Sequence, residues 1–176
     1  MKDIVYDIPT FNPTQRRHTL AVLVDNEFGV LARVIGLFSG RGYNIESLTV
    51  AEVQHENSAH SGLSRITIVT SGTEMVIEQI KKLLERMVPV HKVHDLTVEG
   101  AHLERELALV KVASEGRPRV EALKAADIFR ARVVDATQAS CIFELTGEPR
   151  KIDAFIDILK PLGLVEVCRT GIAAIG

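Results

Sequence analysis

The stretch DNEFGVLARVIGLFSGRGYNIESLTV, residues 25–50, decides the fold of this 176-residue chain. Its apolar side chains recur at the spacing of a helix with one buried face, at Val30, Leu31, Val34, Ile35 and Phe38. Asp25 or Asn26 can accept hydrogen bonds from free amides of the first turn, and the glycines of segment 40–42 tolerate a left-handed ending. The stretch therefore predicts a helix followed by a strand, NIESLTVAEVQ (44–54).

Strands and a second helix surround this stretch. HTLAVLVD (18–25) alternates like a strand, and LSRITIVT (63–70) is a third strand joined to the second by the polar loop 55–62. Residues 71–74 match a capping box at the start of a second helix, and VHKVHDLTVE (90–99) closes the unit as a fourth strand. This order predicts a four-stranded antiparallel sheet with both helices on one face.

The same order returns after Gly100. Strands are predicted at 106–114, 132–138, 140–147 and 164–170, and helices at 117–131 and 148–163. We therefore expect an α+β fold of two tandem ferredoxin-like βαββαβ units, with an extension (1–16), a first unit (17–99) and a second unit (100–176). In units of about 75 to 80 residues burial is incomplete and stability marginal, so packing between units or chains is expected to add stability.

The composition is typical of a globular protein, with 46% hydrophobic and 25% charged residues. Twenty-one basic and 23 acidic residues give a formal net charge of −2, which provides no positive field to hold a nucleic acid. No apolar run approaches the roughly 18 residues that span a bilayer, and the start lacks the hydrophobic stretch of a signal peptide. We therefore expect a cytoplasmic protein without membrane contact.

Cys141 and Cys168 lie in apolar, strand-like runs and are expected to be reduced core residues.

The residues that could support catalysis or bind a metal form no recognised arrangement. His91 and His94 are three apart on a predicted strand, which places them on opposite faces, and we expect both at the surface. Glu104 and Glu106 share a strand face, and paired acids at the entry to a domain are typical of solvated charge. The sequence has neither of the phosphate-binding motifs GxGxxG and GxxxxGK[ST]. We predict no catalytic residue and no metal ligand.

Two turns carry groups that could bind a small zwitterion, and we expect both at the same end of the sheet. The helix N-terminus in DNEFG offers unpaired amides to a carboxylate, and Gly29 lets a ligand approach the backbone. The amide oxygens of Asn26 and Asn44 could receive an ammonium group. Three aliphatic side chains would line the pocket, Val30, Leu31 and Ile45. These groups fit a free amino acid such as valine, although the same residues could instead only cap the helix, ease the turn and begin the strand.

Residues 25–50, with LSRITIVT and GAHLERELALVKV (100–112), closely resemble the regulatory small subunit of acetolactate synthase, also called acetohydroxyacid synthase. The resemblance covers residues 17–176. It implies an N-terminal ACT domain, a C-terminal ACT-like domain, and a homodimer, formed through the ACT domains, that binds a large catalytic subunit. That subunit carries thiamine diphosphate, magnesium and FAD, so no cofactor is expected on this chain. The small subunit catalyses nothing, activates its partner and confers feedback inhibition by a branched-chain amino acid, usually valine, in the synthesis of valine, leucine and isoleucine.

The resemblance also implies an effector site where two ACT domains meet. Carried over by position, this site falls on Asn26, Gly29, Val30, Leu31, Ala32, Asn44 and Ile45. Two departures from the family are the extension before Arg17 and the long polar loop 55–62. One alternative is a free-standing ACT amino-acid sensor that acts on another enzyme or a regulator. A second is an enzyme of the acylphosphatase type, which needs a catalytic Arg in an anion-binding loop, whereas the turn DNEFG has none.

Overall fold

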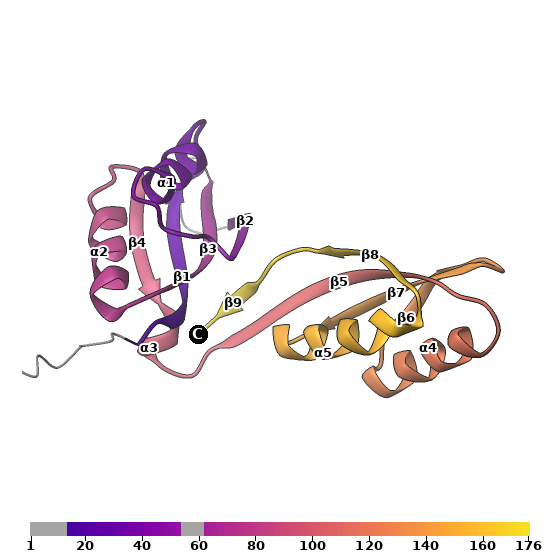
Figure 1. The fold of residues 1–176 in the computed structure, drawn as a ribbon. Coiled ribbons are helices and arrows are strands. Elements are labelled where there is room, and N and C mark those ends of the chain that lie inside the picture. The colour runs from indigo at the N-terminus through magenta and orange to yellow at the C-terminus, as the bar shows by residue number, and fades with distance from the viewer. Residues whose placement is uncertain (1–13, 54–61) are drawn as a thin grey trace, which may run out of the picture.

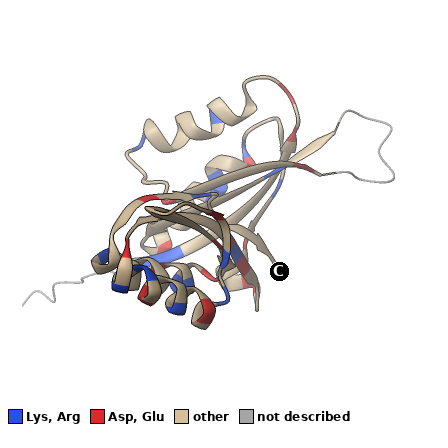
Figure 2. Ribbon diagram, turned by 90° about the vertical axis from the view of Figure 1, so that its right-hand side faces the viewer, with Lys and Arg blue, Asp and Glu red and all other residues tan. Residues whose placement is uncertain are grey.

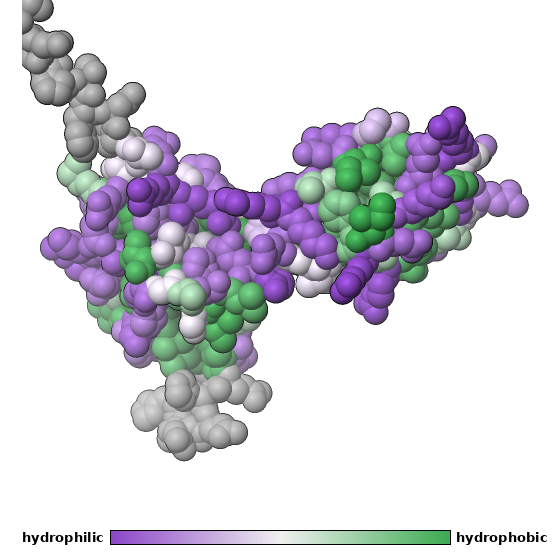
Figure 3. Space-filling view, turned by 90° about the horizontal axis from the view of Figure 1, so that it is seen from below, coloured by the Kyte–Doolittle hydropathy of each residue, from purple (hydrophilic) through white to green (hydrophobic). Residues whose placement is uncertain are grey.

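The computed structural model describes residues 14–53 and 62–176, which form two α+β domains joined end to end (Figure 1). Each domain is an antiparallel sheet with helices packed on one face. Figure 3 shows the domains as two lobes joined by a narrower, mainly hydrophilic neck. Residues 1–13 of the predicted extension and residues 55–61 of the predicted loop lie outside the described residues.

The N-terminal domain has the predicted order of elements. Its strands are β1 (Arg16–Asp25), β2 (Ser47–Val53), β3 (Leu63–Gly72) and β4 (Val90–Asp95), and its helices are α1 (Val30–Ser39) and α2 (Glu74–Glu85). The strands lie in the order β2-β3-β1-β4, and every pairing is antiparallel. The alternation predicted from the sequence buries one face of this sheet under both helices, in a core that includes Leu20, Val22, Val34, Phe38, Ile66, Ile68, Ile77, Ile80 and Leu84.

The C-terminal domain repeats this plan. Its elements are β5 (Leu103–Ala113), α4 (Gly116–Phe129), β6 (Arg132–Ala136), β7 (Ser140–Gly147), α5 (Pro149–Leu159), the 3-10 turn η1 (Lys160–Leu162) and β8 (Leu164–Arg169). The strands lie in the order β6-β7-β5-β8, again antiparallel. Phe155 of α5 packs against Phe129 and Phe143, with ring centroids 5.3 and 6.0 Å away. The predicted fold class, two tandem ferredoxin-like domains, is confirmed.

Several element ends differ from the predictions. Residues 96–99 form a short helix, α3 (Leu96–Glu99), because the Asp95 side chain accepts a hydrogen bond from the Thr97 amide at 3.1 Å and so caps it. Helix α2 is capped by Thr73 rather than by Ser71. Helix α1 begins directly after Gly29 without any side-chain cap, so neither of the predicted capping residues serves it.

The last strand was missed by the sequence analysis. Strand β9 (Ala173–Ile175) pairs antiparallel with Leu103–Arg105, the first residues of β5. Strands β8 and β9 thus run along the same long strand, and the chain bends between them toward the N-terminal domain (Figure 1). Three of the last five residues, 172–176, are alanine or glycine, so the sequence of this segment has little hydrophobic periodicity.

The two cysteines differ in environment. Cys141 is buried in the core of the C-terminal domain, as predicted. The prediction for Cys168 is wrong, because this residue is exposed. Cys168 lies on the edge strand β8, where it pairs with Leu109 of β5. Side chains alternate along the strand, and its neighbour Val167 is the residue that packs against the core.

Candidate functional site

The turn between β1 and α1 leaves its backbone open. Gly29 has a φ of +81°, and a Cβ built on it would meet no atom within 4 Å. The Arg33 amide donates to the Gly29 carbonyl at 3.0 Å, so the amides of Leu31 and Ala32 precede the regular hydrogen bonds of the helix. The turn therefore presents free donors and the positive end of the helix dipole, as the sequence predicted.

The predicted site residues differ in how far they reach the surface. The Asn26 and Asn44 side chains are exposed, and Leu31 is 37% exposed. Ile45 is half-buried against the core, and Val30 belongs to the core itself. Val30 therefore supports the turn from beneath, whereas the two amides and Leu31 are free to meet a ligand or another chain.

The two turns lie at opposite ends of the sheet, so the prediction that they share one end is wrong. The Asn26 amide donates to the Gly62 carbonyl at 3.0 Å, beyond the last residue of β1. The Asn44 carbonyl accepts a 2.6 Å hydrogen bond from Thr70, which pairs with His18 near the start of β1. At a rise of about 3.4 Å per residue, these ends are roughly 24 Å apart. Helix α1 runs the length of the sheet between them, which the prediction overlooked.

An exposed apolar edge connects the two turns. Strand β2 is the last strand of its sheet and, among the described residues, pairs only with β3. On this strand Val50 is 43% exposed, and Phe28, in the turn between β1 and α1, is fully exposed. Helix α1 carries a single charged residue, Arg33, and appears almost wholly tan at the top of Figure 2. Exposed apolar side chains beside an unpaired strand edge are suited to contact with another chain.

Both domains match family profiles. A profile described as "AHAS small subunit-like ACT domain" matches residues 20–92, and one described as "Small subunit of acetolactate synthase" matches residues 105–176. The chain belongs to the acetolactate synthase small-subunit family. The two matches coincide with the two sheets, so the family accounts for the tandem ACT-type architecture.

Individual acetolactate synthase small subunits are similar to this chain over nearly its whole length. The acetolactate synthase small subunit of Aquifex aeolicus is 48% identical over 157 residues, which are 89% of this chain and 79% of that protein. The isozyme 3 small subunit of Escherichia coli is 45% identical over 160 residues, 90% of this chain and 94% of that protein. The crystal structure of the small subunit from Thermotoga maritima superposes with a TM-score of 0.76 at 37% identity, covering 91% and 96% of the two chains.

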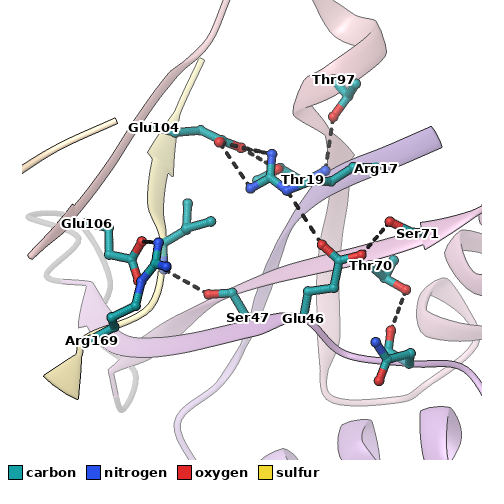
Figure 4. Close-up of polar contacts among 12 residues, drawn as sticks. Arg17, Thr19, Glu46, Ser47, Thr70, Ser71, Thr97, Glu104, Glu106 and Arg169 are labelled. Carbon is teal, nitrogen blue, oxygen red and sulfur yellow. Dashed lines mark hydrogen bonds and ion pairs between the residues drawn. The ribbon is translucent and has the colours of Figure 1, made fainter. Parts of the chain in front are cut away.

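The two acids of β5 are paired with arginines, Glu104 with Arg17 of the ACT domain and Glu106 with Arg169 of its own domain. The Glu104 and Glu106 side chains are only 12% and 4% exposed, so the prediction of solvated charge is wrong. Arg17 lies 3.2 Å from Glu104, and Arg169 holds Glu106 with hydrogen bonds of 2.6 and 2.8 Å (Figure 4). Burial opposes ionisation of Glu104, but the hydrogen bond from Thr19 and the charge of Arg17 hold its pKa below the usual value. The hydrogen bond to Glu106 raises the pKa of Arg169. Both acids are therefore held by arginines.

Three histidines of the ACT domain each lie beside an acid. His91 and His94 are at the surface, as predicted, and each lies 2.6 Å from an acid, Asp25 and Glu99 respectively. Sequence reasoning missed His18, which is buried 2.8 Å from Asp95.

Within residues 14–53 and 62–176, no cluster of three His, Cys, Asp or Glu side chains could hold a metal ion. In the same residues no helix has the length and apolar character needed to cross a bilayer.

Proposed function

We propose that this chain is a cytoplasmic, non-catalytic regulatory subunit that activates the large catalytic subunit of acetolactate synthase and confers feedback inhibition by valine or another branched-chain amino acid. The observation that supports this most directly is the β2 edge, which has half of the predicted effector site at each end. Thiamine diphosphate, magnesium and FAD would belong to the catalytic subunit, and this chain would bind none of them.

Two-fold pairing of β2 edges would complete the site. Strand β2 runs parallel to β1, because both pair antiparallel with β3. If two copies pair antiparallel through β2, the start of β2 in one copy meets the end of β2 in the other. Asn44 of the second copy would then lie toward the Gly29 end of the first. The dimer would hold two identical sites, each with groups from both chains.

The chemistry of each composite site fits an aliphatic amino acid. The ligand carboxylate would accept hydrogen bonds from the Leu31 and Ala32 amides, where the helix dipole favours negative charge. The amide oxygens of Asn26 and of Asn44 from the second copy would accept from the ammonium group. The Leu31 and Ile45 side chains would contact the aliphatic part. No formal protein charge is needed, since the ligand is itself neutral overall.

Binding must favour one state of the assembly for this function to work. An effector shifts an equilibrium only by its differential affinity for two states, so valine must bind more tightly to the inhibited arrangement. A tenfold preference corresponds to about 1.4 kcal/mol of coupling.

Thermal unfolding with each branched-chain amino acid tests the ligand, since a ligand selective for the folded dimer raises stability by RT ln(1 + [L]/Kd). Reconstitution with a catalytic subunit tests the partner. We expect higher catalytic activity with this chain and lower activity when valine is added. A free-standing sensor would instead bind the amino acid and leave the catalytic subunit unbound and unactivated.

A further inference from the structure

The last seven residues, 170–176, link the two domains, and we call them the C-terminal clasp. On the C-terminal domain, the Thr170 amide donates to the Leu107 carbonyl at 3.0 Å, and its hydroxyl accepts from the Leu107 amide at 3.1 Å. The chain then turns at Gly171, which has a φ of +84°, and β9 continues along β5. The clasp is thus part of the C-terminal sheet at both of its ends.

The middle of the clasp is bound to strand β2 of the ACT domain. The Ile172 amide donates to Ser47 Oγ at 2.8 Å, and Thr49 Oγ1 donates to the Ile172 carbonyl at 2.9 Å. The Arg65 guanidinium donates to the Ala174 carbonyl at 2.8 Å. Two neighbouring β2 hydroxyls therefore hold both backbone groups of one clasp residue.

The clasp also covers the sheet face opposite the ACT helices. Ile172 and Ala174 are 6% and 9% exposed, and they form a small apolar cluster with Ala21, Val69 and Leu96. Burial of these side chains favours the docked position of the clasp. This cluster is separate from the main core of either domain.

Around the clasp the contact between the domains is loose and polar. A cavity of about 480 Å³ lies between them, lined by residues of both domains and by the clasp. Its charged groups are paired: Arg17 lies between Glu46 and Glu104 (Figure 4). Arg169 pairs with both Glu106 and Asp153. Each of the two arginines is shared by two carboxylates, so these pairs leave no free positive charge to attract an anion. Beside this cavity the clasp is the closely packed contact between the domains.

The outer edge of the same strand, β2, is the edge at which we propose that the effector binds. Ser47 and Thr49 lie three and five residues beyond Asn44, with Glu46 between them and the turn. Their side chains point to the clasp, whereas the outer edge of β2 faces away from β3. A change in β2 position caused by a ligand at that edge would reach the clasp through these two hydroxyls.

We propose that Ser47 and Thr49 are positioning residues that transmit effector occupancy from the β2 edge through the C-terminal clasp to the C-terminal domain. This inference rests on the proposed function. By linkage, a contact that couples two sites changes the affinity at each only when the other is occupied. Loss of the contact should therefore leave valine binding intact and disconnect it from inhibition.

The test compares a double variant with a single variant of the full-length protein, each reconstituted with a catalytic subunit. Thr49→Val combined with Ser47→Ala removes both hydroxyls with little change in shape. Thr49→Ser keeps the hydroxyl and serves as the rescue variant. We expect the double variant to bind valine, measured by calorimetry, within about threefold of the parent and to activate normally. Its maximal inhibition at saturating valine should fall below half that of the parent, and Thr49→Ser should retain full inhibition.

Hydrogen exchange gives a second readout that a loss of stability alone would not produce. In the parent, valine should change amide exchange of residues 103–105 and 173–175, the β5–β9 pairing. In the double variant this valine-dependent change should disappear. If the double variant is fully inhibited, or if it keeps the exchange response of the parent, the clasp proposal is wrong. The proposed function would still stand. If the parent itself neither binds nor responds to any branched-chain amino acid, the proposed function fails and the clasp proposal fails with it.

Discussion

The Arg17 guanidinium lies 3.2 Å from the Glu104 carboxylate, 87 residues further along the chain, and so joins β1 of the ACT domain to β5 of the C-terminal domain. Thr19, on the same strand as Arg17, also donates a hydrogen bond to Glu104. One carboxylate thus receives donors from two residues of the other domain. Because its pKa is held below the ordinary value, this contact makes folding depend on pH.

Glu104→Gln should lower the free energy of unfolding by about 1 kcal/mol near neutral pH, since the charge-assisted hydrogen bonds are weakened. A carboxyl whose pKa is lowered on folding stabilises the fold above its unfolded pKa and loses that contribution as pH falls through the folded pKa. The difference between parent and variant should therefore shrink as the pH falls below about 4.5, the ordinary value for Glu. Urea unfolding at a series of pH values measures it.

Glu148→Gln is the matched control for this prediction. Glu148 is largely exposed and lies 3.8 Å from Arg105, so its removal should change stability by less than about 0.5 kcal/mol at any pH. An equal loss in both variants, or a loss that persists at low pH, would show that the interdomain pair contributes no specific stability.

The fold was predictable from sequence because its determinants are local. The helical spacing in residues 25–50 and the alternation in 18–25 each fix one element and its buried face. Predictions failed where a short element depends on a partner distant in sequence. Strand β9 forms only because β5 and the ACT sheet receive it, and its own residues carry no period.

The candidate site was predictable in composition but not in arrangement. The binding groups at Asn26, Gly29 and Asn44 could be predicted from sequence, because the hydrogen-bonding capacity of side-chain amides and of a helix start is known. Their relative positions depend on the direction in which α1 crosses the sheet, which puts Asn44 at the opposite end of the sheet from Asn26 and Gly29. The interdomain role of Glu104 was likewise hidden, because its partners Arg17 and Thr19 lie more than 80 residues away.

Val50→Lys should weaken the proposed dimer. Val50 is 43% exposed on the edge strand, and a charge there disfavours edge pairing and repels its two-fold copy. The dimer dissociation constant, measured by analytical ultracentrifugation, should rise at least about tenfold, or about 1.4 kcal/mol. Val133→Lys is the control, since Val133 is 45% exposed on β6, the edge strand of the other domain. Equal dissociation in the two variants would contradict association through β2.

Gly29→Asp should abolish valine inhibition and preserve activation of the catalytic subunit. The added carboxylate would occupy the open space before the α1 amides and repel the ligand carboxylate. Gly116→Asp is a matched control, because Gly116 also has a positive φ, +60°, and open space where a Cβ would lie, in the equivalent turn of the second domain. Inhibition curves of the reconstituted enzyme should show resistance only for Gly29→Asp. Full sensitivity of that variant would place the effector site elsewhere.

Gly171→Ala should loosen the clasp. The substitution has two costs: alanine is strained at a φ of +84°, and its Cβ would lie 3.0 Å from both Ser47 Oγ and Thr49 Cγ2. Gly42→Ala isolates the first cost, because Gly42 has a φ of +71° with no atom within 4 Å of the added Cβ. Thermal unfolding should therefore show about 1 to 2 kcal/mol more destabilisation for Gly171→Ala than for Gly42→Ala. Since the excess arises only where β2 touches the clasp, equal losses in the two variants would mean that the close approach of Gly171 to β2 does not contribute to the stability of the protein.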